Sequence, residues 1–172
     1  MDEATIENIF DLTERNMSAV LGSTSTREED YVQWRESFDR NLRVGTRYLL
    51  CEKDGLLRGY LAYTHRPSQR DLYVNEVQIH PQFRRSGITL RRLVTVFLDA
   101  VEHCECDTVR TYANGRNVLS QTILCKMGFE VTTETERGIR FCVDKALLVS
   151  RLNRLRESSR DRTRTVPKAP EG

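Results

Sequence analysis

The feature that most constrains this chain is a strand, a loop and a helix that follow one another between Leu72 and His103. Pro81 ends the strand, because proline has no N–H to donate to a neighbouring strand. Beyond the loop, apolar residues recur at spacings of three and four, which is typical of a helix with one buried face. They are Leu90, Leu93, Val94, Phe97 and Val101, in a helix expected over about residues 87–103. A strand that leads into such a helix predicts a layered α/β fold.

The strand itself has an unusual pattern over residues 72–80. Leu72 and Val74 share one parity, whereas Val77 and Ile79 share the other. Successive side chains of a strand point to opposite faces, so apolar residues on both parities indicate an extra residue or a strand buried on both faces. A β-bulge near residues 75–76 would account for the first alternative. Both interpretations stay open at this point.

Other elements surround this unit. Two helices are expected first, one with Ile6, Ile9, Phe10 and Met17 on its apolar face, the other with Tyr31, Trp34, Phe38 and Leu42. A flexible linker at residues 22–26 separates them. Strands are expected at 48–52, 57–64, 108–113, 129–133 and 139–143, with a hairpin turn at 53–55. A further helix is expected at 117–127, and a final helical stretch runs through Leu148, Leu152 and Leu155. The fold class is α/β, with a mixed sheet flanked by helices.

Length and charge bound the domain organisation. The chain has 172 residues and a net charge of +2, which suits one globular domain and does not demand nucleic acid. We expect this domain over residues 1–157 and a basic, disordered tail over 158–172, rich in Arg, Thr and Pro. No apolar run is long enough to span a bilayer and the start lacks a signal-peptide pattern, so we expect a cytoplasmic protein that needs no membrane.

The five cysteines show no framework spacing and are expected to be free thiols. Residues 103–106, His-Cys-Glu-Cys, lack a second ligand pair at a usual distance. We therefore expect a plain helix-to-strand connection there and no metal site.

The loop that enters the helix has the chemistry of an anion site. It carries Arg84 and Arg85 and one glycine, Gly87, where the backbone can approach a ligand closely. Free N–H groups and the positive end of the helix attract phosphates. Because the loop lacks the P-loop ending and the three-glycine dinucleotide pattern, a pyrophosphate-bearing cofactor of another kind is favoured.

These residues resemble the GNAT family of N-acetyltransferases. The pyrophosphate loop of that family has the pattern Arg/Gln-x-x-Gly-x-Gly/Ala after a strand, and here Arg84, Gly87 and Thr89 stand at its defined positions. A later family segment begins with Asn and ends in Gly-Phe, as residues 117–129 do from Asn117. The resemblance covers about residues 47–145 and implies the GNAT-like acyl-CoA N-acyltransferase fold, with a largely antiparallel central sheet. The family's first strand is not evident at the N-terminus, where we expect helix.

The resemblance also implies roles for individual residues. Acetyl-CoA would be the co-substrate and an amine its acceptor. A backbone N–H near the bulge would polarise the thioester carbonyl. Asn117 would hold the cofactor arm, or would simply cap its helix. The backbone of Val77, Gln78 and Ile79 would bind the pantetheine, and the N–H groups of the loop would bind the pyrophosphate, with Arg84, Arg85, Ser86, Gly87, Ile88, Thr89 and Leu90 as its residues.

The catalytic groups are less defined. Glu76 is the first candidate for the general base and Tyr73 the second, although Glu76 could also be a solvated strand residue. The family's usual tyrosine acid falls at Leu124, which cannot donate a proton; Cys125, Ser120 or Tyr112 could replace it, or the thiolate could leave unaided. The side chain of Thr89 is expected to face the phosphate, either crowding it or donating to it.

The leading hypothesis is therefore direct acetyl transfer from acetyl-CoA to a primary amine. The alternative is a non-catalytic acyl-CoA-binding or interaction module, which the residues at 89 and 124 motivate. The acceptor could be a protein or a small molecule. A homodimer is left open, and the basic tail is expected to be solvated rather than bound to nucleic acid.

Overall fold

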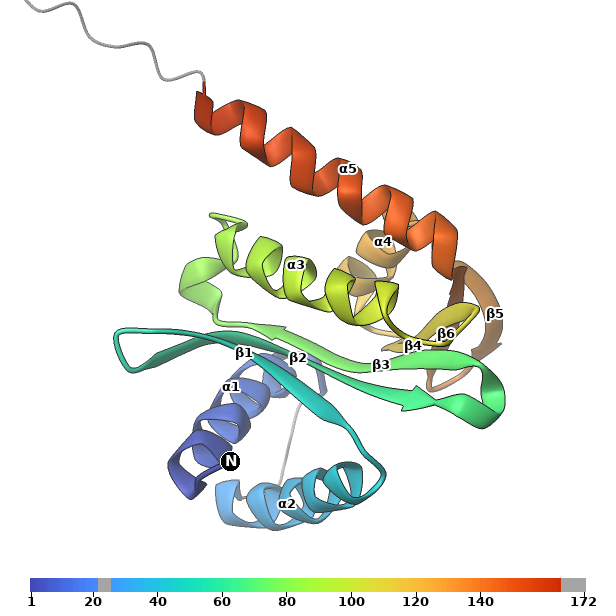
Figure 1. The fold of residues 1–172 in the computed structure, drawn as a ribbon. Coiled ribbons are helices and arrows are strands. Elements are labelled where there is room, and N and C mark those ends of the chain that lie inside the picture. The colour runs from blue at the N-terminus through green and yellow to red at the C-terminus, as the bar shows by residue number, and fades with distance from the viewer. Residues whose placement is uncertain (22–25, 165–172) are drawn as a thin grey trace, which may run out of the picture.

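A six-stranded sheet forms the centre of the protein, with helices on both faces (Figure 1). The computed structural model describes residues 1–21 and 26–164. The linker predicted at 22–26 lies, apart from Thr26, outside these residues. The order of the strands within these residues is β1-β2-β3-β4-β6-β5, and among their pairs only β3–β4 is parallel. The strands are β1 (Arg47–Lys53), β2 (Leu56–Arg66), β3 (Asp71–Ile79), β4 (Thr108–Asn114), β5 (Glu130–Thr135) and β6 (Gly138–Asp144).

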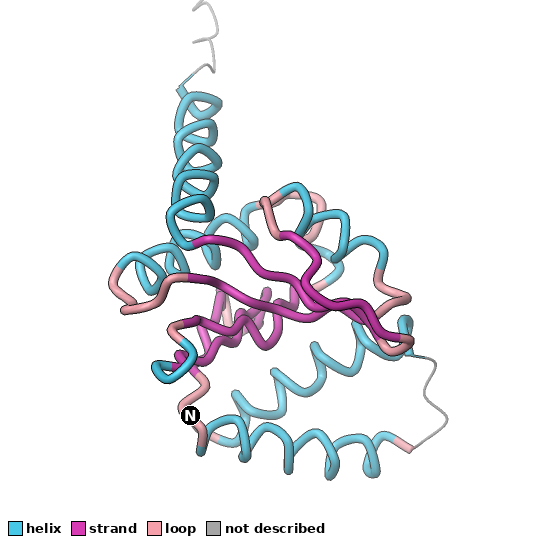
Figure 2. The backbone as a smooth tube through the Cα atoms, turned by 90° about the vertical axis from the view of Figure 1, so that its right-hand side faces the viewer, coloured by secondary structure: helices cyan, strands magenta, loops and turns pink. Residues whose placement is uncertain are grey.

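Two groups of helices enclose the sheet. Helices α1 (Glu3–Leu21) and α2 (Arg27–Arg43) cover one face, whereas α3 (Ile88–Glu102), α4 (Val118–Lys126) and α5 (Lys145–Arg164) lie on the other (Figures 1 and 2). The mixed, largely antiparallel α/β fold that the sequence predicted is therefore confirmed. The chain begins with helix α1, also as predicted.

Each face of the sheet has its own apolar core, because side chains alternate along the strands. On the α3 side, Leu61 and Val74 pack with Leu93 and Phe97. On the α1 side, Tyr60 and Ala62 pack with Ile9 and other apolar residues of the first two helices. The predicted apolar faces of α1 and α2 account for much of this second core.

Helix α5 continues further than the sequence predicted. Its residues Leu148 and Leu152 are fully buried against the body of the protein, and the helix extends past the body to Arg164 (Figures 1 and 2). Residues 158–164, which were expected to be disordered, are therefore helical. Residues 165–172 and the side chain of Leu155 lie outside the described part of the chain. None of the helices in residues 1–21 and 26–164 is long and apolar enough for a membrane span.

Turn and cap residues end the elements where their local chemistry requires. Asp54 and Gly55 both have positive φ, at 55° and 73°, as a two-residue hairpin turn between β1 and β2 needs. Asn117 caps α4 by accepting a hydrogen bond from the Ser120 N–H at 3.1 Å. Gly128, just past the end of α4, has φ of 90°. The predicted hairpin turn, the cap and the helix-ending glycine are all confirmed.

Helix α3 contacts the sheet most closely at Gly59 of β2. A Cβ atom on Gly59 would lie 2.9 Å from Cγ2 of Thr89 and 2.7 Å from the carbonyl oxygen of Gln78. The absence of a side chain at residue 59 therefore allows the first turn of α3 to lie directly on β2.

We expect Gly59→Ala to lower the free energy of unfolding by about 1–3 kcal/mol, because the added methyl group overlaps backbone that cannot move freely. The matched control is Gly115→Ala, where the nearest atom would be 3.8 Å away and φ is not positive. Urea unfolding of both variants measures the difference. Equal stability of Gly59→Ala and Gly115→Ala would show that the close contact is not a constraint.

Candidate functional site

The two central strands of the sheet separate halfway along their length. β3 and β4 pair in parallel from Asp71 opposite Thr108 to Val74 opposite Thr111, and pair no further. β4 nevertheless continues beside β6 as far as Asn114. The hydroxyl of Thr111 donates to the carbonyl oxygen of Val74 at 2.9 Å, at the last point of contact. Beyond it, an opening separates residues 75–79 from the end of β4; we call this opening the split.

A β-bulge stands at the start of the split. Val74 lies opposite Tyr63 and Glu76 lies opposite Ala62, so Asn75 is an extra residue in β3. The hydroxyl of Thr64 donates to Oδ1 of Asn75 at 2.9 Å and bonds the buried Thr46 hydroxyl at 2.8 Å. The bulge, one of the two alternatives that the sequence left open, is confirmed. The hydrogen bonds of the Thr64 and Thr46 hydroxyls that stabilise it were not predicted. Thr64 in β2 and Thr46 just before β1 are a weak signal, because their contact depends on a strand pairing that the sequence does not reveal.

The bulge explains the two parities of the strand. Leu72 and Val74 lie in the core under α3, and Val77 lies on the same side because it pairs with Leu61 of that core. Glu76 moves to the α1 side, opposite Ala62. Val77 is 41% exposed, so the alternative of a strand buried on both faces is wrong.

Backbone groups of β3 point into the split. The N–H of His80 donates to Arg58 of β2 at 2.9 Å. Because N–H groups alternate in direction along a strand, those of Val77 and Ile79 point away from β2 and towards the split. Backbone groups that are not paired with another strand can bind an extended chain, as a further strand would. The carbonyl oxygen of Ile79 accepts from Asn16 at 3.2 Å and Arg84 at 3.1 Å.

The loop after β3 ends at a helix start with no side-chain cap. Gly87 stands at the cap position with φ of 65° and has no side chain to offer, whereas Thr26 caps α2 and Asn117 caps α4. The N–H groups of the first helical residues, Ile88 to Leu90, have no acceptor within the helix. The Ser86 hydroxyl is 3.4 Å from the Ile88 N–H, a long contact. The start of α3 can therefore bind an anion.

Two expectations about side chains in the first turn of α3 are wrong. Thr89 is 2% exposed and packs on Gly59, so it neither crowds nor donates to a phosphate through its side chain. Leu90 is 36% exposed instead of lying on the buried stripe. Arg84 and Arg85 are both exposed, and the guanidinium of Arg84 also bonds Asn16 of α1 and the carbonyl of Ile79.

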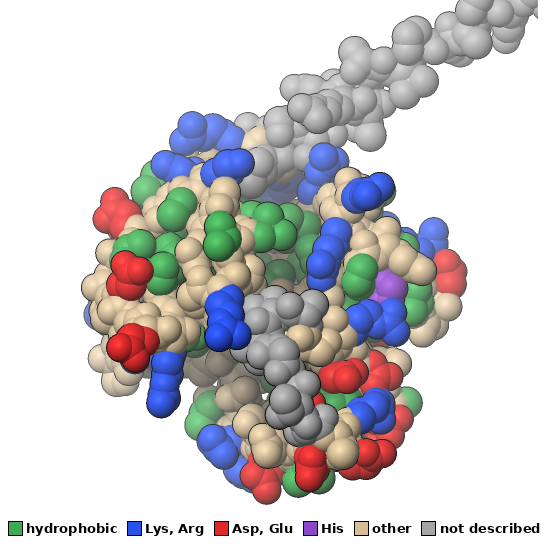
Figure 3. Space-filling model, turned by 180° about the vertical axis from the view of Figure 1, so that it is seen from behind, with side chains coloured by type: hydrophobic (Ala, Val, Ile, Leu, Met, Phe, Trp, Pro, Cys, Tyr) green, Lys and Arg blue, Asp and Glu red, His purple; other side chains and the backbone are tan. Residues whose placement is uncertain are grey.

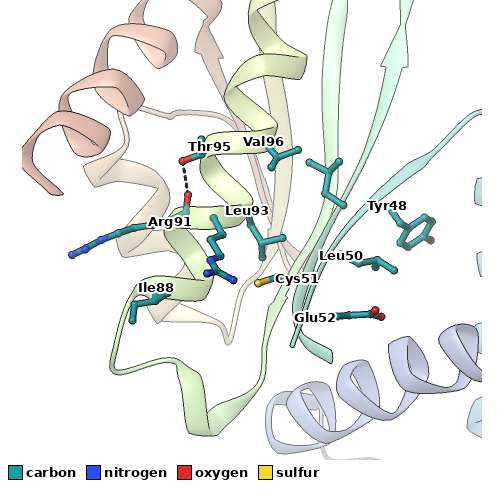
Figure 4. A pocket seen from close by; sticks show the side chains of 11 residues that line it. Tyr48, Leu50, Cys51, Glu52, Ile88, Arg91, Leu93, Thr95 and Val96 are labelled. Carbon is teal, nitrogen blue, oxygen red and sulfur yellow. Dashed lines mark hydrogen bonds between the residues drawn. The ribbon is translucent and has the colours of Figure 1, made fainter. Parts of the chain in front are cut away.

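A separate hollow of about 660 Å³ lies between α3 and the edge strand β1 (Figure 4). Leu93 and Cys51 line its inner side, and Arg91 and Arg92 are also part of its lining, with Arg91 extending away from the strands. By strand order, β1 is two strands from the split. The hollow therefore lies apart from the split, although Ile88 at the start of α3 also borders it.

Glu76 has the properties of a general base. Burial raises the pKa of its carboxyl, while hydrogen bonds from Gln78 and Tyr60 partly oppose this shift. The bond from Nε2 of Gln78 is 2.7 Å long. Gln78 in turn accepts from Asn16 of α1 at 2.7 Å. Asn16 was missed by the sequence analysis; a polar residue in line with the apolar face of α1 is the signal that could have found it.

Tyr73, the second candidate base, has different surroundings. Burial raises the pKa of its hydroxyl, and the guanidinium of Arg66 lies 4.5 Å from its ring centre. A raised pKa keeps the hydroxyl protonated at neutral pH, which disfavours Tyr73 as a base. His80 is buried beside Arg15, and burial lowers the pKa of its ring, which stays neutral.

The candidate acids occupy the other side of the split. Leu124 packs against the core under α3, so it supports the fold at the position of the family's tyrosine. Cys125 is exposed and Ser120 is half-buried on α4. Tyr112 follows the last residue of β4 that pairs with β3, so its backbone borders the split; its hydroxyl donates to the carbonyl of Arg137 at 2.5 Å. Within residues 1–21 and 26–164, no group of three or more His, Cys, Asp or Glu is placed to hold a metal.

The fold matches solved acetyltransferases. PaiA N-acetyltransferase from Thermoplasma acidophilum, in complex with coenzyme A, superposes with a TM-score of 0.66 at 12% identity over 84% of this chain and 95% of that chain. An acetyltransferase of the GNAT family from Staphylococcus aureus Mu50 gives 0.67 at 10% identity, over 84% and 96%. YncA from Salmonella typhimurium, solved with its cofactor acetyl-CoA, gives 0.54 at 17% identity, over 84% and 91%.

The chain thus has the fold of the GNAT acetyltransferases, as the resemblance predicted. No family model and no curated protein sequence matches it. The likeness lies in the arrangement of strands and helices, at sequence identities below those that carry residue roles across.

The buried carboxyl of Glu76 predicts a pH-dependent stability difference. Its pKa is raised on folding, so its stabilising contribution is present below the unfolded pKa and is lost as pH rises through the raised value. Glu76→Gln stays neutral and avoids this loss. We expect the stability of the variant relative to wild type to increase as pH rises through this window, measured by urea unfolding at several pH values. Glu134→Gln, on exposed strand β5, is the control, and a constant difference for Glu76→Gln would contradict the assignment.

Proposed function

We propose that this protein is an acetyl-CoA-dependent N-acetyltransferase in which a primary amine attacks the acetyl group directly. The observation that carries the proposal is the continuity of the split with the uncapped start of α3. The open backbone edge at Val77 and Ile79 leads along the chain into the anion-binding N–H groups at residues 88–90. One ligand that has an extended amide arm and a pyrophosphate fits this sequence of features.

The proposed cofactor contacts follow the order of the chain. The N–H and C=O groups of Val77 and the N–H of Ile79 bond the pantetheine as a neighbouring strand would. The N–H groups from Arg85 to Leu90 bind the pyrophosphate, and the guanidinium of Arg85 adds charge. Asn117 lies on the far side of the split, at the start of α4. Its Oδ1 caps that helix, and its amide N–H groups are available to the cofactor arm. PaiA was solved with coenzyme A and YncA with acetyl-CoA, which supports acetyl-CoA as the co-substrate.

The proposed chemistry starts with removal of a proton from the acceptor. An ammonium must lose a proton before its nitrogen can attack, and the carboxylate of Glu76 accepts it. The nitrogen then forms a bond to the acetyl carbon, and the bond from that carbon to sulfur breaks. A backbone N–H at the bulge stabilises the developing oxyanion. As the amide forms, its nitrogen gives up its second proton to solvent, and the sulfur, which leaves as thiolate, takes up a proton from solvent.

A second candidate function is an acyl-CoA-binding module without catalysis. Leu124 favours it, because this side chain stands at the position of the family's acid and packs into the core. Both functions require the protein to bind the cofactor, and only the first includes turnover. We also propose that residues 1–157 form the cofactor-binding domain and that the basic segment 158–172 is not part of it.

Cofactor binding tests the loop. We expect Arg85→Glu to weaken the affinity for coenzyme A by about ten- to a hundredfold, because a positive charge beside the pyrophosphate becomes negative. Arg47→Glu makes the same change of charge at an exposed position at the start of β1. Calorimetric titration gives both dissociation constants. Equal affinities of the two variants would place the pyrophosphate elsewhere.

Turnover tests the chemistry. Wild type is expected to release thiol from acetyl-CoA when amines are added, and Glu76→Gln to lower kcat by a hundredfold or more while coenzyme A binds as before. The rate should fall as pH decreases through the raised pKa of Glu76, because the protonated carboxyl accepts no proton. Glu134→Gln should retain the wild-type rate. Tight cofactor binding without thiol release over a broad set of amines would favour the binding module.

A further inference from the structure

A cavity of about 460 Å³ lies between the first two helices and the sheet. Glu76 and Tyr48 line it from the sheet, and side chains of α1 and α2 line the rest. It opens on the α1 face, whereas the uncapped start of α3 lies across the sheet (Figure 1). Since Glu76 borders both this cavity and the split, a molecule in the cavity would meet the proposed acetyl group at that carboxyl. This argument rests on the proposed function.

An aromatic wall forms one side of the cavity. Phe10 and Trp34 have ring centres 5.3 Å apart, Trp34 and Phe38 are stacked at 4.9 Å, and Phe38 lies 4.9 Å from Tyr48. Tyr48 lies 6.1 Å from Tyr60, whose hydroxyl reaches Glu76. The wall is therefore continuous up to the proposed base. Phe10 and Phe38 are each 2% exposed, so the half-buried rings of Trp34 and Tyr48 are the ones that can contact an apolar body or a cation.

The charged side chains of the cavity are all acidic. Glu14, Asp30 and Glu76 line it, and no Lys, Arg or His is among the lining residues that the structure describes. The two helices together carry nine acidic and five basic residues. Figure 3 shows Asp and Glu side chains gathered over the lower part of the molecule, where these helices lie. An ammonium is attracted to such a cavity, and a carboxylate is repelled.

We propose that this cavity is the acceptor site and that it takes amines which carry an apolar body and no carboxylate. The ammonium lies at Glu76 and the apolar body lies against Trp34 and Tyr48. Amino acids with a free α-carboxylate are rejected, because that group would lie beside the carboxylates of the cavity and would find no cationic partner among its described lining residues.

A matched pair of acceptors tests the proposal. Phenethylamine and phenylalanine share the amine and the aromatic body and differ in the carboxylate. We expect kcat/KM for phenethylamine to exceed that for phenylalanine by at least a hundredfold. Glu14→Lys should reduce this ratio at least tenfold by placing a cation in the cavity, whereas Glu36→Lys, an exposed residue of α2 outside the lining, should leave it unchanged.

Occupancy of the cavity can be measured without turnover. Trp34 is the single tryptophan of the chain, so its fluorescence reports on this wall alone. In the presence of coenzyme A, phenethylamine should change the emission saturably and phenylalanine should not. Such a change without thiol release would support the acceptor site and reject the transferase. Turnover of both amines at equal kcat/KM, or turnover of phenethylamine with no change in Trp34 emission, would overturn the acceptor site and leave the transferase standing.

Discussion

The structure depends on one extra residue in β3. Asn75 shifts the register of the strand against β2 and is held by the hydroxyl of Thr64. Past this point β3 no longer pairs with β4, so its backbone is open to a ligand. The same shift brings Val77 to the α3 side and turns Glu76 to the α1 side. A single backbone insertion thus creates the split and places a buried carboxyl at its border.

The sheet divides the proposed reaction between its two faces. Helix α3 offers unpaired N–H groups to an anion, and the close contact between Gly59 and Thr89 fixes its first turn on the sheet. Helices α1 and α2 offer aromatic rings and carboxylates to a cation. Asn16 connects the two, because it bonds Gln78 behind the proposed base and also Arg84 of the loop. Movement of α1 would therefore affect both cofactor and acceptor.

The sequence predicted the features that depend on neighbouring residues. The parities of Leu72 and Val77 offered the bulge as one of two alternatives, and Asn117 and Gly128 predicted the ends of α4, because these signals lie within one element. The direction of Thr89 was wrong, since it depends on Gly59, thirty residues earlier. The aromatic cavity was not predicted either, because its walls come from helices and strands that meet only in the fold. The assignment of catalytic residues remains a proposal, supported most directly by the burial of Glu76.

Hydrogen exchange of backbone amides, with and without coenzyme A, tests the central claim most directly, because that claim concerns N–H groups. We predict slower exchange on binding at Val77 and Ile79 and at the amides of residues 85–90, with little change on edge strand β5. Protection of the loop alone would show that the cofactor does not enter the split. Protection along β1 and α3 at the 660 Å³ hollow, with none at Val77 or Ile79, would contradict the account.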